Sequence, residues 1–245
     1  MKATRPAGFR FPSKFADLNP RQTQILETAE ARLGKFGVNG LELRAIADDL
    51  EVSPSLINHY YTNSEELIFD TVLFSYNKLV YGIQEKNQNQ PDAEKILRSW
   101  IESMLNWLIE YPGIGVILEF PRQVLRTGGK KATSPEKILT HFTKEMSKIG
   151  IDNVSFMASA VYALQTSKPF KVLAGAKIAT LIATNQRFAA NTSLLGFATI
   201  GGGLWVAGRR PADSKTSLWM KLGFDPAKQM TKTVDEMIRI IKSSS

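Results

Sequence analysis

The amino-acid sequence predicts an all-α protein, with an N-terminal three-helix head followed by a larger helical body. Two observations favour this class. Apolar residues recur at helical spacing along most of the 245 residues, whereas the alternating pattern of strands is weak. Helix start signals are also frequent, since Asn19, Asn63 and Asp92 each stand as N-caps before an apolar periodic run.

The first predicted helix begins at Pro20, after the Asn19 cap and with Gln22 three residues beyond it, and Gly37 can end it. Its expected core residues are Ile25, Leu26, Ala29, Leu33 and Phe36. Beyond the head, helical periodicity predicts further helices at about 64–84, 92–111, 135–149, 152–167, 170–187, 188–208 and 226–242.

Residues 43–61 predict a helix–turn–helix. Apolar residues at helical spacing from Leu43 to Leu50 define a short helix, and the chain breaks directly after it. A second short helix opens with Ser53 as N-cap and Pro54 at the first helical position. So brief a junction forces the helices to cross steeply, the geometry that places a second helix in a DNA major groove. An ordinary helical hairpin is the alternative interpretation.

In the second helix, Ile57 and Tyr61 are four residues apart, and they are expected to join Ile46, Leu50 and Val52 in one small core. The opposite side is then available to a partner, and we expect these residues there: Pro54, Ser55, Leu56, Asn58 and His59.

The head residues form one constellation without a gap: Gly37, Val38, Arg44, Ile46, Ala47, Leu50, Val52, Ser53, Ile57, His59, Tyr60, Tyr61, Glu65 and Leu67. This constellation resembles the DNA-binding domain of the tetracycline-repressor (TetR) family of transcriptional regulators. Four positions, Glu42, Glu51, Asn58 and Ser64, differ from the residues usual in that family, which are Thr, Gly, Tyr and Lys. The resemblance implies a DNA-binding domain over residues 19–68, with these residues on the DNA side: Arg44, Ser53, Pro54, Ser55, Leu56, Asn58, His59 and Tyr60.

The formal net charge of +8 suggests a polyanionic partner, but the basic residues are unevenly distributed. Residues 36–70 carry only Arg44 against seven acidic residues, whereas residues 1–35 carry seven basic residues against three acidic ones. Phosphate attraction is therefore expected mainly from Lys2, Arg5, Arg10, Lys14, Arg21 and Lys35, unless these are merely solvated surface charges. Residues 1–18 form a predicted basic arm, which either enters a minor groove or packs its aromatic residues on the body.

Residues 69–245 are the predicted ligand-binding and dimerisation domain. Large apolar side chains recur there at helical spacing: Phe74, Trp100, Met104, Trp107, Phe120, Phe142 and Met146. For each residue alone, simple core packing is the favoured interpretation. The TetR resemblance implies that together they line a chamber for a small apolar or aromatic effector.

Residues 188–208 are uncharged, and their length would suffice to span a membrane. The polar cluster at residues 191–193 and five glycines argue against a span, and we expect no membrane partner. Small residues allow helices to approach closely, and the resemblance implies a homodimer interface in this region. Residues 1–20 lack the apolar core of a signal peptide, which favours a cytoplasmic protein.

Patterns typical of enzymes are missing. The run Gly128–Lys131 lacks the spacing of a phosphate-binding loop, and Gly201–Gly203 follows no predicted strand. With no cysteine and two distant histidines, His59 and His141, we expect no metal and no cofactor. The resemblance implies a ligand-responsive DNA-binding regulator, a repressor released from its operator by the effector. The alternative is a small-molecule- or partner-binding protein of the same fold that has lost sequence-specific DNA binding.

Overall fold

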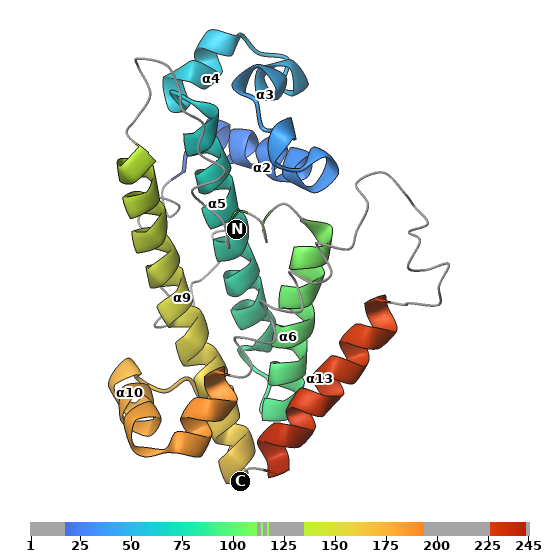
Figure 1. The fold of residues 1–245 in the computed structure, drawn as a ribbon, viewed down its shortest axis with the longest axis vertical. Coiled ribbons are helices and arrows are strands. Elements are labelled where there is room, and N and C mark those ends of the chain that lie inside the picture. Colours follow the sequence, from blue (N-terminus) through green and yellow to red (C-terminus); the bar gives the residue numbers. More distant parts are fainter. Residues whose placement is uncertain (1–17, 112–113, 115–116, 118–134, 194–225, 244–245) are drawn as a thin grey trace. The chain divides into compact units, whose positions relative to one another are not determined.

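The computed structural model describes residues 18–111, 114, 117, 135–193 and 226–243, and every regular element within these ranges is helical. Figure 1 shows α2 (Pro20–Phe36), η1 (Val38–Gly40), α3 (Leu43–Asp49), α4 (Pro54–Tyr60), α5 (Ser64–Asn87), α6 (Ala93–Glu110), α9 (Pro135–Thr166), α10 (Gly175–Thr184) and α13 (Pro226–Ser243). The predicted all-α class is thus confirmed. Residues 1–17 of the predicted arm, Phe120, and residues 194–208 of the predicted interface lie outside the described ranges. None of the described helices is long and apolar enough to cross a membrane.

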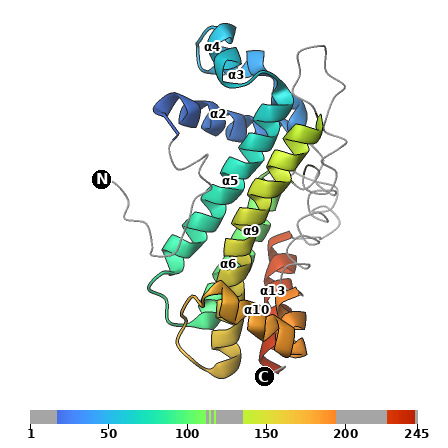
Figure 2. The same cartoon turned by 90° about the vertical axis from the view of Figure 1, so that its left-hand side faces the viewer.

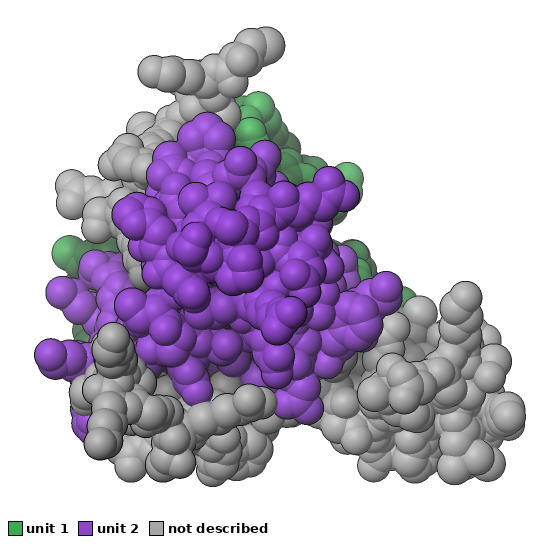
Figure 3. Space-filling model, turned by 90° about the horizontal axis from the view of Figure 1, so that it is seen from above, with its two compact units in different colours: residues 1–9, 79–109, 150–245 green, residues 10–78, 110–149 purple. Residues whose placement is uncertain are grey.

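The chain divides into two compact units, coloured separately in Figure 3. Unit 2 comprises the described parts of residues 10–78 and 110–149, so the predicted head at 19–68 lies entirely within it. Unit 1 comprises the described parts of residues 79–109 and 150–245. Helices α5 and α9 therefore contribute residues to both units, and α6 lies in unit 1 except for its last residue, Glu110.

Local capping starts three helices as predicted. Asn19 accepts the backbone N–H of Gln22 at 2.9 Å, and the Gln22 side chain accepts the N–H of Asn19 at 3.1 Å, a capping box. Asn63 accepts the N–H of Glu66 at 2.8 Å at the start of α5. Asp92 accepts from the first turn of α6 at 3.0 and 3.3 Å.

The expected core face of α2 is correct except at its end. Ile25, Leu26, Ala29 and Leu33 are buried, but the prediction that Phe36 is buried is wrong, because half of it is exposed. The cations of Arg32 and Lys35 lie 5.0 and 4.9 Å from the centre of its ring, which lets the ring stay at the surface.

A buried carboxylate joins α2 to α5 within unit 2. Glu30 is 5% exposed, accepts a 2.7 Å hydrogen bond from Ser75 Oγ and forms an ion pair with Lys78 Nζ. Burying an ionised carboxylate without such partners would be strongly unfavourable. The tie therefore holds α2 in a defined position on α5.

Two predicted helices are one. Helix α9 runs without a break from Pro135 to Thr166, through Gly150, where the sequence predicts an interruption (Figures 1 and 2). A glycine inside a helix costs only about 1 kcal/mol relative to alanine. Burial of Ile149 beside it and of Phe156 further along the helix offsets that cost, and the buried Asn153 accepts a hydrogen bond from Trp100.

The helix predicted at 170–187 is shorter, because α10 spans only Gly175–Thr184. Helix α9 ends in a left-handed residue, Ser167 with φ 51°, and Pro169 follows, so the chain does not re-enter a helix at once. Asn185 interrupts the helical run and accepts the N–H of Phe188 at 2.9 Å, which begins another helical segment.

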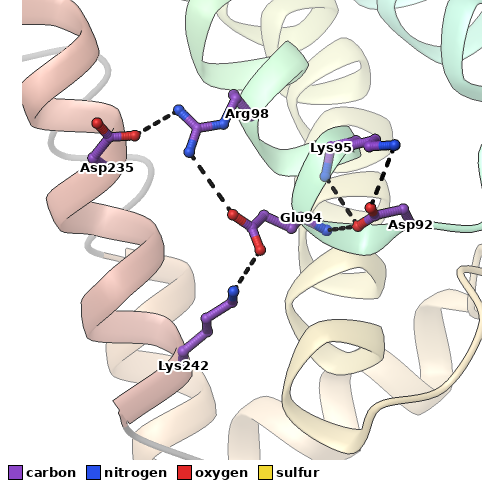
Figure 4. A network of polar contacts seen from close by, with 6 residues as sticks. All are labelled: Asp92, Glu94, Lys95, Arg98, Asp235 and Lys242. Carbon is purple, nitrogen blue, oxygen red and sulfur yellow. Dashed lines mark hydrogen bonds and ion pairs between the residues drawn. The ribbon is translucent and has the colours of Figure 1, made fainter.

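Unit 1 is held by apolar packing, with ion pairs at its surface. The C-terminal helix α13 buries Val234, Met237, Ile238 and Ile241. Figure 4 shows the polar contacts between α13 and α6, in which Arg98 pairs with Asp235 at 2.7 Å and Lys242 pairs with Glu94 at 2.5 Å. Asp235 and Lys242 are more than half exposed, so these pairs direct the docking of α13 more than they stabilise it.

Removing the Lys78 cation is expected to destabilise the protein. Lys78→Met keeps the aliphatic stem but leaves the buried Glu30 carboxylate without its charged partner. We expect the free energy of unfolding in urea to fall by about 1–3 kcal/mol, near the low end because Lys78 is half exposed.

The matched control is Lys95→Met, which removes a cation paired at 3.9 Å with Asp92 on the surface. It should change the free energy of unfolding by less than about 0.5 kcal/mol. Adding Glu30→Gln to Lys78→Met should recover part of the loss. Equal losses in Lys78→Met and Lys95→Met would contradict a structural role for the Glu30 tie.

Candidate nucleic-acid interface

The helix–turn–helix is built around a small buried core within unit 2. Helix α3 packs against α4 and against α2. Ile46, Ala47 and Ile57 have no exposed surface, and Tyr61, directly after α4, is 6% exposed. These residues confirm the predicted core, except that Leu50 and Val52, which are also expected in it, are only partly buried.

The turn between α3 and α4 is a Schellman motif. Val52 N–H donates to the carbonyl of Ala47 at 3.0 Å, and Glu51 N–H donates to that of Asp48 at 3.2 Å. Glu51 itself has φ 53°, the left-handed region that favours glycine. The position at which TetR proteins usually have glycine is therefore strained by a side chain in this chain.

Arg32 braces the end of α3 against α2. Its Nε donates to the carbonyl of Gly40 at 2.7 Å, and its Nη1 pairs with Asp49 Oδ2 at 2.8 Å. Gly40 is buried so close to Phe36 that an added Cβ would lie 2.5 Å from the Cβ of that side chain. Sequence reasoning missed Arg32, because its partners are 8 and 17 residues away and no local pattern reveals them.

Ser53 is the N-cap of α4, as predicted, and has the extended backbone of that position, but the predicted capping hydrogen bond of its side chain is wrong. Its hydroxyl makes no cap hydrogen bond and instead lies 3.0 Å from the hydroxyl of Ser55. The backbone carbonyl of Ser53 accepts the N–H of Leu56 at 3.0 Å, which satisfies that donor of the first turn without the side chain. Both hydroxyls are therefore at the exposed start of α4.

Helix α4 separates its core side from an exposed side. Ile57 is fully buried, whereas Pro54, Ser55, Asn58 and His59 are exposed, and Leu56 and Tyr60 are intermediate. Arg44 is exposed on the neighbouring α3. The predicted DNA-contacting residues are thus brought together on two helices that pack on each other, with their side chains accessible.

These side chains have the chemistry of base readout. An Asn amide can pair bidentately with adenine, an Arg guanidinium with guanine, and an apolar side chain can contact a thymine methyl group. Asn58, Arg44 and Leu56 supply these three functions. The acidic residues Glu42 and Glu51 are also exposed close to them in the chain, so the described head offers phosphates little net attraction.

Tyr61 fixes the end of α4 to α5. Its buried hydroxyl makes a hydrogen bond with Asp70, a residue that is 4% exposed. Burial, followed by the charge of Asp70, raises the pKa of Tyr61 far above its ordinary value. The phenol therefore stays protonated and acts as the donor of this bond.

Known proteins resemble this chain in fold but not in sequence. No protein-family model matches the chain, and no curated protein matches its sequence. Solved structures do match. One of them is the fatty acid degradation regulator FadR of Bacillus halodurans. The alignment covers 91% of this chain and 96% of the FadR chain, with a TM-score of 0.56 and 10% sequence identity.

Two further structures are similar. Mycobacterium smegmatis BioQ aligns with a TM-score of 0.51 and 11% identity, over 94% of this chain and 100% of its own. A TetR/AcrR-family transcriptional regulator of Thermobifida fusca aligns with a TM-score of 0.50 and 12% identity, over 91% and 97%. The chain has the TetR/AcrR regulator fold.

Within this TetR/AcrR fold, the residues predicted to line a chamber fall in both units. Trp100, Met104 and Trp107 are buried on α6 in unit 1, and the Trp100 indole N–H donates to Asn153 Oδ1 at 2.6 Å. Unit 2 contains three others: Phe74, Phe142 and Met146, of which Phe142 is buried. Among the described residues, no cluster of three or more His, Asp or Glu side chains is placed to hold a metal ion.

Replacing Glu51 by glycine is expected to stabilise the protein, because the turn holds a left-handed backbone. Glycine relieves that strain, but it also increases the backbone entropy of the unfolded chain, which opposes the gain. The net effect should be a rise of about 0.5–1 kcal/mol in the free energy of unfolding.

Glu51→Gln is the matched control, since it removes the charge but keeps a side chain at φ 53°. It should leave the free energy of unfolding nearly unchanged. A gain in Glu51→Gln as large as that in Glu51→Gly would assign the effect to charge and contradict backbone strain at this turn.

Proposed function

We propose that the protein is a homodimeric, ligand-responsive transcriptional regulator that acts in the cytoplasm. More narrowly, we propose a repressor that a small apolar or aromatic effector releases from a double-stranded DNA operator. The observation that carries the proposal is α4, which buries Ile57 and leaves Ser55, Asn58 and His59 accessible at the start and side of a short helix. Because the chain has the TetR/AcrR fold, we interpret this accessible side of α4 as the surface that contacts DNA.

In this proposal, residues 19–68 bind DNA and residues 69–245 bind the effector and form the dimer. The two copies of α4 would occupy half-sites about one helical turn apart. Because the described head is acidic, we propose that the basic arm, residues 1–18, supplies much of the phosphate attraction. Residues 188–208, with their small side chains, are the proposed dimer interface.

The effector is proposed to bind among the large apolar side chains of the body: Phe74, Trp100, Met104, Trp107, Phe120, Phe142 and Met146. Such a ligand can release DNA only if it binds the DNA-free arrangement more tightly than the DNA-bound one. Helix α5 follows the head directly and extends into unit 1, which makes it the proposed element of coupling.

A specific observation favours a second candidate function. Glu42, Asp48 and Glu51 are exposed on or next to α3, where phosphates would be repelled. A small-molecule- or partner-binding protein with this fold, but without sequence-specific DNA binding, would tolerate these charges. Gel-shift assays with the promoter next to the protein's own gene separate the two functions, since only the regulator retards that fragment.

Base contacts by Asn58 and Arg44 are expected to carry operator affinity. On the fragment retarded by the wild-type protein, Asn58→Ala and Arg44→Ala should each weaken binding by about 1–3 kcal/mol, the usual value of a good base contact. Fluorescence anisotropy at fixed salt measures the affinity.

Gln24→Ala is the control, because Gln24 is an exposed polar residue on α2, outside the proposed contact surface. Its operator affinity should match that of the wild type. If both Asn58→Ala and Arg44→Ala bind like the wild type, the assignment of the DNA surface is wrong.

Effector binding is expected to change tryptophan emission and to weaken DNA binding. Trp100 and Trp107 are buried on α6, so an apolar ligand among the body residues should alter their fluorescence, and Trp107→Phe should reduce that response. By linkage, the factor by which the ligand weakens operator binding must equal the factor by which the operator weakens ligand binding. Ligands with equal affinity in the presence and absence of operator would favour the second candidate function.

A further inference from the structure

Unit 2 contains a cavity that shares Tyr60 with the proposed DNA surface and shares no residue with the proposed effector site. Its volume is about 280 Å³, and it lies where the end of α4 meets α5 and the first turns of α9. The residues that decide its chemistry are Tyr60, Tyr61, Phe69, Asp70, Ile138 and His141. Helices separated by about seventy residues in the chain thus converge on one hollow.

A carboxylate oxygen and an imidazole nitrogen face each other across a gap in this cavity. His141 Nε2 lies 3.9 Å from Asp70 Oδ1, which is too long for a direct hydrogen bond. The Nε2 atom is buried and has no hydrogen-bond partner, although the rest of the ring is partly exposed. A buried polar atom without a partner is unfavourable, so the site favours a ligand that forms a hydrogen bond with it.

Asp70 can accept another hydrogen bond. It already accepts from the Tyr61 hydroxyl, but an ionised carboxylate has about four lone-pair sites. In the tautomer whose Nε2 carries no proton, His141 offers a lone pair to the cavity. One nitrogen that carries several N–H groups can then donate to Asp70 and to His141 at the same time, because charge-assisted bonds of about 2.8 Å to each would span the gap.

The charges and the apolar side chains that line the cavity indicate the class of ligand. The carboxylates of Glu66 and Asp70 both line the cavity, against one ammonium, that of the exposed Lys137. Glu66 accepts from the Thr62 hydroxyl at 2.9 Å, which holds it at the cavity. The remaining wall is aromatic and aliphatic, a surface that suits an apolar group and, on the ring faces, a cation.

We propose that this cavity binds a small primary ammonium ligand. The ammonium group bridges Asp70 and His141, and the apolar part of the ligand lies against Phe69 and Ile138. Tyr61, at the end of α4, is hydrogen-bonded to Asp70 in this site. Binding of the ligand to Asp70 would therefore affect the position of α4. The binding itself requires neither DNA nor an effector in the body, and it is measured on the free protein.

The test is proton NMR of the full chain titrated with benzylammonium. The chain has two histidines, and His59 is exposed on α4, so His59→Gln assigns the two ring resonances. We expect a saturable shift of the His141 ring protons and none for His59. Benzyl alcohol, the neutral counterpart, should produce no saturable shift at the same concentrations.

Variants test the two acceptors, with calorimetry as the readout. Asp70→Asn keeps the shape but removes the charge, and should weaken benzylammonium binding at least tenfold. His141→Phe removes the second acceptor at a partly exposed position and should also weaken it at least tenfold. Asp48→Asn, which neutralises an exposed acid on α3, should bind like the wild type.

Three results would overturn the proposal: no saturable response of His141, equal binding of benzyl alcohol, or wild-type affinity in His141→Phe. If Asp70→Asn does not fold, His141→Phe and the benzyl alcohol titration decide the question alone. Loss of binding here leaves the gel-shift result unaffected, and failure of the gel shift leaves this titration unaffected, so the two proposals fail separately.

Discussion

The left-handed turn at Glu51 is the constraint on which the head of this protein depends. Its two backbone hydrogen bonds close α3 and turn the chain so that α4 begins within four residues. The turn places α3 and α4 so that Ile46 on α3 and Ile57 on α4 are both buried, while Asn58 on α4 stays accessible. A non-glycine residue holds this conformation only because the surrounding packing over-determines it.

Polar ties then fix the helices of the head to one another and to α5. Arg32 holds the end of α3, Glu30 joins α2 to α5, and Tyr61 joins the end of α4 to Asp70. Each tie includes a buried or partly buried group, so each discriminates strongly between correct and incorrect docking. The ion pairs of α13 with α6 are exposed by comparison, and apolar burial provides most of the stability there.

The same polar ties connect the proposed functions. Asp70 is at once the acceptor that anchors Tyr61 behind α4 and the carboxylate of the proposed ammonium site. The acidic character of the head has a corresponding consequence. Glu42, Asp48 and Glu51 reduce phosphate attraction, so DNA recognition by α4 would depend on base contacts and on basic residues outside the head.

The sequence by itself determined the helical class, the helix–turn–helix and the starts of α2, α5 and α6, because capping and apolar periodicity involve residues within about four positions. The proposed DNA side of α4 follows from the same local spacing around Ile57. Only the tertiary structure decided that Glu30 is buried, that α9 continues through Gly150, and that Asp70 and His141 share a cavity. These features arise from contacts between residues far apart in the chain, and packing there overrides local preference.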